Sequence, residues 1–258
     1  MKKNISAKKQ LGQHFLVNEQ VIQKIFLAIQ DNIATLPIVE IGPGMGALTK
    51  YLIKLPQQIT CVELDSRCID YLKSYNQFNK INLIEADFLK LDFATTFSGE
   101  QAIVGNFPYN ISSQIIFKAI ENRIQVPVVV GMFQKEMADR VAAKHGSKTY
   151  GIISVLTQYY YDATLLFDIE PKNFAPPPKV MSSILLLKRK ENLLPLKDEK
   201  LFTNIVKFGF NQRRKMLRSS LKAILPKSFL EDVFFNQRAE QLSVEDFVAL
   251  ANKAVDYV

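Results

Sequence analysis

The sequence predicts an α/β protein: a Rossmann-like, mostly parallel sheet with an antiparallel edge, followed by a small all-helical domain. Three observations favour this fold. Short apolar runs alternate with amphipathic helical runs through residues 36–143, which is typical of a parallel sheet covered on both faces. Two strand-like runs then follow without a helix between them, and beyond Lys200 only helical spacing remains. We therefore expect one domain in residues 1–189 and a helical domain in residues 190–258.

The elements of the first domain follow from local patterns. Asn18 is a typical N-cap, and the apolar residues after it recur at helical spacing. Parallel strands are expected at residues 36–41, 59–63, 81–85, 101–105 and 126–130. The amphipathic runs between and after them predict helices at residues 47–55, 67–75, 113–120 and 134–143.

The edge of the sheet and the helical domain come next along the chain. Strand-like residues 164–169 and 183–188 are joined by a segment that contains the prolines 176–178, which exclude a helix there. We expect these two strands to pair antiparallel at one edge. Helical spacing recurs at residues 201–208 and 243–250, and Ser243 with Asp246 resembles a capping box.

The composition predicts a soluble cytoplasmic protein with no metal site. The 258 residues include only two cysteines and two histidines, which excludes a disulfide framework and fits no common zinc pattern. No apolar run approaches the ~20 residues that span a bilayer, so no membrane partner is expected. The N-terminus lacks the apolar core of a secretory signal.

The net charge of +8 is concentrated at two ends of a nearly neutral body. Residues 1–10 contain four lysines and no acid, and residues 188–222 contain eleven lysines and arginines against three acids. This distribution favours a polyanionic partner that is held at the edges of the protein. The alternative is a lysine-rich surface that is merely solvated.

A cofactor site is predicted by the glycine loop 42–46 and by an acid on the next strand. The small residues Gly42 and Gly44 let the backbone approach a ligand closely, and Glu63 can accept both hydroxyls of a ribose. NAD and S-adenosylmethionine both carry such a ribose. The loop reads G-x-G-x-G rather than the G-x-G-x-x-G of dinucleotide sites, which disfavours NAD. The alternative is a tight turn with a solvated acid.

Polar residues also follow the third and fourth strands. Asp87 can accept a hydrogen bond from an adenine amine, and Asn106 begins the tetrapeptide Asn-Phe-Pro-Tyr. The Asn106 side chain and the carbonyl of Phe107 offer two acceptors for the two hydrogens of an exocyclic amine. Bonding both hydrogens leaves the nitrogen lone pair free to attack a sulfonium methyl group.

Two aromatic rings and a proline complete the predicted catalytic group. Tyr109 can stack on the target base, and Pro108 fixes the local φ angle. Phe174, in a stiff proline-rich loop, can close the second face of the base or can equally be a core plug. The alternative for the tetrapeptide is that Asn106 is a cap or turn residue and Tyr109 a core residue.

Together these motifs resemble the ribosomal RNA adenine dimethyltransferases, over nearly the whole chain. The resemblance covers segments 8–16, 39–49, 62–65, 85–93, 104–112, 133–141, 150–160, 173–184 and 208–221. "GQHFL" at 12–16 and "PPPKVMSS" at 176–183 are the most specific segments, because a generic methyltransferase is not expected to contain them.

The resemblance implies an S-adenosylmethionine-binding catalytic domain in residues 1–189 and an RNA-binding domain in residues 190–258. It implies that His14 and Leu16 lie against the methionine end of the cofactor, and that Asn106 touches cofactor and target amine. The expected reaction converts two neighbouring adenosines in the 3′-terminal hairpin loop of small-subunit rRNA to N6,N6-dimethyladenosine, within an assembling 30S-type particle. The expected protein is a monomer whose residues 212–215 grip RNA phosphates.

Two departures and three rival functions qualify the resemblance. Phe107 stands where Leu is most often expected, and His14 where many members have Asn. The nearest rival is the antibiotic-resistance branch that dimethylates large-subunit rRNA. The others are a non-catalytic RNA-binding protein on the same scaffold, which should tolerate loss of Asn106, and an NAD enzyme.

Overall fold

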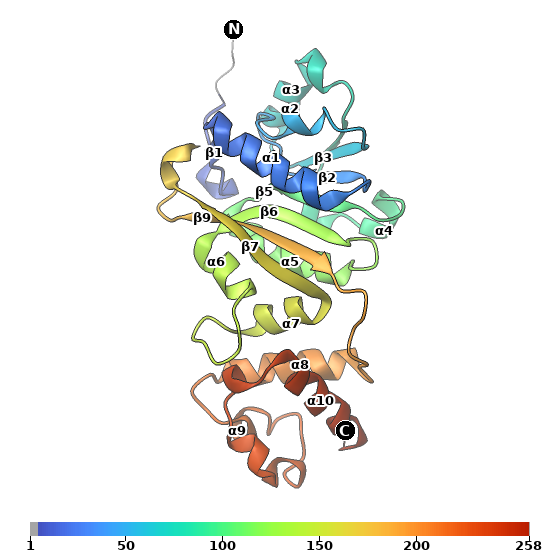
Figure 1. Ribbon diagram of the computed structural model, residues 1–258, viewed down its shortest axis with the longest axis vertical. Helices are drawn as coiled ribbons and strands as arrows, with labels where there is room; N and C mark the ends of the chain where they lie inside the picture. Colours follow the sequence, from blue (N-terminus) through green and yellow to red (C-terminus); the bar gives the residue numbers. More distant parts are fainter. Residues whose placement is uncertain (1–4, 258) are drawn as a thin grey trace. The chain divides into compact units, whose positions relative to one another are not determined.

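A computed structural model describes residues 5–257, and a seven-stranded sheet forms the centre of its first part (Figure 1). The strand order in these residues is β4-β3-β2-β5-β6-β9-β7. The predicted parallel sheet is confirmed, because each expected strand pairs parallel with its neighbour. The five strands are β2 (Ile38–Ile41), β3 (Ile59–Glu63), β4 (Asn82–Glu85), β5 (Ala102–Asn106) and β6 (Val128–Gln134).

The edge of the sheet is made by the two strands that lack a helix between them. β9 (Ser182–Arg189) runs antiparallel to β6, with Leu186 opposite Val130. β7 (Tyr161–Ile169) lies outside β9. The sheet therefore has the antiparallel edge expected from the sequence, where two strands follow one another with a proline-rich segment between them.

Helices and buried side chains cover both faces of the sheet. α1 (Glu19–Ile33) begins at Asn18, whose side chain accepts hydrogen bonds from the first turn, and its apolar stripe shares one core cluster with Val104 and Val130. Ile103, whose side chain points to the opposite face, is also fully buried. The other helices of this part are α2 (Thr49–Leu52), α3 (Ser66–Lys73), α4 (Phe93–Thr96) and α5 (Ser112–Glu121), and α6 (Lys135–Val141) begins in it.

The helix expected at residues 47–55 is shorter in the structure. α2 covers only Thr49–Leu52. The preceding loop makes left-handed turns at Gly42, Gly44 and Gly46, with φ angles of 65°, 56° and 77°, and residues 47 and 48 remain in the turn that follows them. At the other end, residues 53–55 form a turn and a bend.

A second, two-stranded sheet joins the N-terminal segment to the proline-rich loop. β1 (Phe15–Leu16) pairs antiparallel with β8 (Phe174–Ala175). The sequence did not predict this pairing, since two residues are too few to show a period. It brings segments about 160 residues apart into register, with Leu16 opposite Phe174.

The chain divides into two compact units. The first extends through Ala138 and includes Ala163–Arg189, and the second combines Asp139–Asp162 with the chain from Lys190 onward. The expected boundary after residue 189 is one of these divisions. Residues 139–162, expected with the sheet, lie in the second unit because Tyr159 packs on Phe202, with ring centroids 5.0 Å apart.

The second unit is helical. Ser243 and Asp246 form the predicted capping box, with reciprocal hydrogen bonds of 3.1 and 2.9 Å. The α-helices wholly within this unit are α7 (Ile152–Tyr160), α8 (Glu199–Asn211), α9 (Leu217–Ser220) and α10 (Val244–Ala254). Within residues 5–257, no helix combines the length and the apolar character that crossing a bilayer requires.

Candidate active site

A cavity of about 320 Å³ lies at the carboxyl ends of β2, β3, β4 and β5. This edge is where ligands bind in open α/β sheets, because the loops there diverge above the strand ends. The structure brings nine of the ten predicted site residues to its wall: His14, Leu16, Gly42, Gly44, Glu63, Asp87, Asn106, Pro108 and Tyr109.

The glycine loop keeps the backbone close to this cavity. Gly42 and Gly44 have positive φ angles, which other residues adopt only with strain. A Cβ atom on Gly44 would also lie 3.0 Å from the ring of Phe15. The loop therefore requires glycine at both positions, which leaves its backbone uncovered by side chains there.

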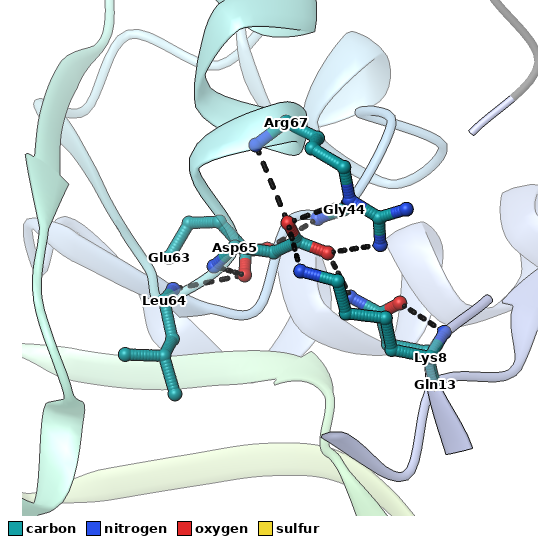
Figure 2. Close-up of polar contacts among 7 residues, drawn as sticks. All are labelled: Lys8, Gln13, Gly44, Glu63, Leu64, Asp65 and Arg67. Carbon is teal, nitrogen blue, oxygen red and sulfur yellow. Dashed lines mark hydrogen bonds and ion pairs between the residues drawn. The ribbon is translucent and has the colours of Figure 1, made fainter. Parts of the chain in front are cut away.

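Glu63 is held by backbone amides at the end of β3 (Figure 2). Its Oε2 accepts a hydrogen bond of 3.0 Å from the Gly44 amide, and its Oε1 accepts from the Leu64 and Asp65 amides at 2.9 and 2.8 Å. Burial raises the pKa of this carboxyl, and the three amide hydrogen bonds oppose that rise.

The amide contacts limit what Glu63 can still accept. A carboxylate offers about four acceptor positions. The three amides occupy three of them and leave one, on Oε2. The position that remains on Oε2 faces no donor from the described residues and can accept a ribose hydroxyl.

Asp87 lies at the cavity beyond the end of β4. Its Oδ1 accepts a hydrogen bond of 3.0 Å from the Leu89 amide, which fixes the side chain as the cap of a short 3₁₀ turn. Among residues 5–257, no donor contacts Oδ2. This oxygen is therefore available to accept a hydrogen bond from a ligand amine.

Asn106 is oriented by the N-terminal segment. Its Nδ2 donates a hydrogen bond of 2.8 Å to the carbonyl oxygen of His14. Within the described residues no donor contacts its Oδ1, and none contacts the carbonyl oxygen of Phe107. The structure thus leaves free the two acceptors that the sequence assigned to an exocyclic amine.

The ring of Phe107 anchors the tetrapeptide from below. It is 1% exposed and packs edge-on against Phe133, with ring centroids 5.0 Å apart. It also fills the space over Gly131, where a Cβ atom would lie 2.0 Å from the ring. Phe in place of Leu is accommodated because Gly131 leaves room for it.

Tyr109 is held at both ends of its side chain. Its hydroxyl forms a 2.5 Å hydrogen bond with that of Ser182, and its ring lies 5.3 Å from the His14 ring. Burial raises the pKa of Tyr109, against the effect of the Ser182 hydrogen bond. A fixed, neutral ring at the cavity wall suits base stacking.

His14 joins the N-terminal segment to the proline-rich loop. Its Nδ1 lies 2.8 Å from the carbonyl oxygen of Pro176, so this nitrogen carries the proton and donates it. His14 therefore makes a side-chain contact to one loop and a backbone contact to Asn106.

Phe174 is the predicted site residue that the structure does not bring to this cavity. Its side chain is 3% exposed and belongs to the core cluster that contains Leu16. Of the two roles expected for it, the structure supports packing beneath the β1–β8 pair.

The sequence analysis missed Glu40, which also lines the cavity. This residue is 2% exposed and accepts a hydrogen bond of 2.7 Å from the Thr49 hydroxyl. Burial raises its pKa to about 7, and the hydrogen bonds from Thr49 and Cys61 oppose the rise. An acid inside an otherwise apolar strand was the available signal.

Asp65 was missed as well, although it follows Glu63 by only two residues. Its side chain is fully buried and contacts Lys8, Gln13 and Arg67. No pattern in the sequence pairs it with the N-terminal segment, because 52 and 57 residues separate Asp65 from Gln13 and Lys8. Nowhere in residues 5–257 do three or more His, Cys, Asp or Glu side chains form a cluster that could hold a metal ion.

Comparison with known proteins gives one consistent family. The model of the ribosomal RNA adenine dimethylase family matches residues 4–256. A "Ribosomal RNA small subunit methyltransferase A" from Parabacteroides distasonis is 48% identical over 248 residues, which are 95% of this chain and 93% of the relative. The protein of the same name from Cytophaga hutchinsonii is 48% identical and covers 96% of this chain and 97% of its own length.

Solved structures agree with this result. A dimethyladenosine transferase from Plasmodium falciparum superposes with a TM-score of 0.77 at 27% identity, covering 92% of this chain and 96% of its own. The 23S rRNA methyltransferase ErmE has a TM-score of 0.71 at 22% identity, covering 93% of this chain and 99% of its own. At 22% identity, the similarity to ErmE supports the fold alone.

Proposed function

The chain belongs to the ribosomal RNA adenine dimethylase family, and we propose that its cavity is the site where adenosine N6 of small-subunit rRNA is methylated. It is an S-adenosylmethionine-dependent enzyme that forms N6,N6-dimethyladenosine. One observation carries the assignment of the site. The side chain of Asn106 presents a free acceptor oxygen to the same cavity that Glu63 faces, at the ends of β5 and β3, the two strands that flank β2.

The residues of the cavity fit S-adenosylmethionine. The volume of about 320 Å³ lies within the range of ligand sites. Glu63 retains one acceptor position for a ribose hydroxyl, and Asp87 retains an oxygen for the adenine amine. Gly42 allows backbone contact, and the N-terminal residues His14 and Leu16 line the wall expected to meet the methionine end.

The chemistry divides between the co-substrate and the chain. S-adenosylmethionine, when bound, supplies an activated methyl group on its sulfonium. Asn106 Oδ1 and the Phe107 carbonyl accept the two N–H hydrogens of the target amine, which turns its lone pair away from them. Tyr109 stacks on the base and Pro108 stiffens the turn between them. Since the amine is neutral, no side chain has to remove a proton before attack. The new N–CH₃ bond replaces the S–CH₃ bond, and the cationic nitrogen then releases its proton to solvent. In the second transfer one N–H remains, so one of the two acceptors is engaged.

The finer points of the proposal concern the substrate. We propose that the substrate is a pair of neighbouring adenosines in the 3′-terminal hairpin loop, on an assembling 30S-type particle in the cytoplasm. The enzyme acts on it as a monomer. The second unit binds the RNA backbone. Its exposed Arg214 and Lys215, which follow α8, support this role because phosphate contacts dominate nucleic-acid affinity.

The test offers the purified chain two RNAs with methyl-labelled S-adenosylmethionine. One is small-subunit rRNA from cells that lack the modification, in free and particle-bound form, and the other is large-subunit rRNA. We expect N6,N6-dimethyladenosine in the small-subunit RNA by mass spectrometry, at positions given by primer extension. Product only in the large-subunit RNA, or none in either, would contradict the proposal.

A further inference from the structure

Residues 11–16 line the cavity, and the segment that contains them, residues 8–16, is called the strap below. Asp65 holds the strap through Lys8 and Gln13 (Figure 2). The Gln13 Nε2 donates a hydrogen bond of 3.1 Å to Asp65 Oδ2, and Lys8 Nζ lies 3.2 Å from Oδ1. Gln13 Oε1 also accepts from the Lys8 amide at 2.9 Å. One glutamine side chain therefore closes the turn of the strap and fastens it to the turn after β3.

The contacts of Asp65 are unequal in strength. Lys8 is about half exposed, so solvent screens its ion pair with Asp65. Gln13 donates to the same buried carboxylate, and its side chain is further held by the hydrogen bond from the Lys8 amide, so less freedom is lost in making the contact. Gln13 is therefore the main fastening of the strap to Asp65.

Asp65 itself is kept in place by its own helix. The Arg67 guanidinium grips both carboxylate oxygens, at 3.0 and 2.6 Å, and lowers the pKa of Asp65 far below its usual range. Asp65 also caps α3 through the Arg67 amide. Its own amide donates to Glu63, so the same turn carries the ribose-binding acid and the anchor of the strap.

The residue after Gln13 reaches the catalytic tetrapeptide. His14, next to Gln13, offers its carbonyl oxygen to Asn106 Nδ2. The two ends of an Asn amide have nearly the same shape, and its terminal torsion is broad. The contact with His14 therefore decides whether Asn106 turns its acceptor oxygen or its NH₂ group toward a target amine.

From these contacts we propose that Gln13 and Asp65 are positioning residues for methyl transfer. They fix the strap so that the His14 carbonyl selects the Asn106 amide orientation in which Oδ1 faces the target amine. The inference rests on the proposed function of the cavity. Neither residue touches the reacting atoms, and both act through His14.

The cleanest variant is Gln13→Ala, because it leaves the Asp65–Arg67 pair and the cap of α3 intact. We expect kcat for methyl transfer to fall about tenfold, the loss that one hydrogen bond explains. KM for rRNA should change less than about twofold, since Gln13 is uncharged and its loss removes no contact to phosphate. Amide hydrogen exchange across residues 8–16 should rise.

The control is Gln57→Ala. Gln57 is a half-buried glutamine that also ties two segments, by a hydrogen bond of 2.6 Å to the Ala34 carbonyl, but lies outside the cavity. It should match Gln13→Ala in its effect on the melting temperature and leave kcat unchanged. Equal kcat losses in the two variants would overturn the positioning role.

A change of charge at the same position tests the pair directly. Gln13→Glu sets two carboxylates against each other, whereas the Asp65–Arg67 pair and the cap of α3 stay intact. This variant should lower kcat further than Gln13→Ala. A kcat for Gln13→Glu equal to or above that of Gln13→Ala would overturn the pairing.

The proposed function and this inference fail separately. A wild-type chain that methylates no rRNA refutes the function, and the strap is then judged by hydrogen exchange and by calorimetry with S-adenosylhomocysteine. Gln13→Ala should still raise exchange in residues 8–16 and weaken that binding several-fold. If hydrogen exchange and S-adenosylhomocysteine affinity in Gln13→Ala equal those of the wild type, the inference is overturned, whether or not the wild type methylates rRNA.

Discussion

The side-chain amide of Asn106 donates a hydrogen bond of 2.8 Å to the backbone carbonyl of His14, 92 residues earlier in the chain. The Nδ2 group of the amide therefore donates to the protein itself, and the acceptor Oδ1 remains available at the cavity. A residue of the N-terminal segment thereby sets the polarity that the catalytic tetrapeptide presents.

Asn106→Ala should lower methyl transfer by roughly a hundredfold or more, because one of two acceptors for the target amine is lost. RNA affinity should stay close to that of the wild type. Single-turnover transfer of labelled methyl groups and filter binding measure the two quantities. The exposed Asn79→Ala serves as control, and wild-type turnover in Asn106→Ala would refute the assigned role.

Glu63→Ala should weaken S-adenosylmethionine binding about tenfold or more, measured by calorimetry. It should also lower the melting temperature, because the amides of Gly44, Leu64 and Asp65 lose their acceptor. Glu85→Ala, at the exposed end of β4, should do neither. Unchanged cofactor affinity in Glu63→Ala would remove it from the binding site.

The basic residues after α8 do not form a uniform group. Arg213 donates to the carbonyls of Ser147 and Tyr150, at 3.3 and 2.9 Å, so it also stabilises the second unit. Arg214→Gln with Lys215→Gln should therefore flatten the salt dependence of rRNA affinity, by about 1.5 in the log–log slope, without loss of stability.

The slope of affinity against salt measures this effect, and the melting temperature checks the fold. Arg213→Gln, by contrast, should lower the melting temperature. A slope that the double variant leaves unaltered would place the RNA-binding surface elsewhere.

Glu40 makes stability fall as pH rises. Its carboxyl has a pKa of about 7 when folded and 4.5 as the unperturbed reference, so between these values the folded state binds the extra proton. The ionised, buried Glu40 carboxylate destabilises the folded state, and this loss of stability is absent below pH 4.5 and complete above pH 7. As pH rises from 4.5 to 8, the free energy of unfolding of Glu40→Gln should therefore increase by about 3 kcal/mol relative to that of the wild type.

Denaturant unfolding at the two pH values measures this gain. Gln keeps an acceptor for Thr49, which limits other effects of the change. The comparison variant is Glu85→Gln, whose side chain is exposed. The assigned pH dependence is contradicted when both variants respond to pH alike.

Gly131→Ala should displace the catalytic tetrapeptide. Its Cβ atom would lie 2.0 Å from the Phe107 ring, and overpacking of this kind costs about 1–3 kcal/mol. Methyl transfer should fall with stability, and Phe107→Leu in the same chain should restore both, because the smaller side chain vacates the space. Circular-dichroism melting and the methyl-transfer assay test the pair. A double variant no better than Gly131→Ala would contradict the packing argument.

The sequence by itself determined the order of strands and helices along the chain and nine of the residues that line the cavity. Apolar runs with glycine or polar residues at their ends predicted the parallel strands, because the carboxyl ends of such strands share one edge of the sheet. That rule alone brings Gly42, Glu63, Asp87 and Asn106 together. Ser243 with Asp246 was equally local, since a capping box lies within one helical turn.

Only the tertiary structure decided which residues hold these groups in place. The pairing of β1 with β8, the burial of Phe174 and the contacts of Asp65 with Gln13 and Lys8 join segments 52–160 residues apart. Such contacts depend on where the folded chain returns, and no local period or motif encodes that. The same holds for the orientation of Asn106, which follows from the His14 carbonyl rather than from its own neighbours.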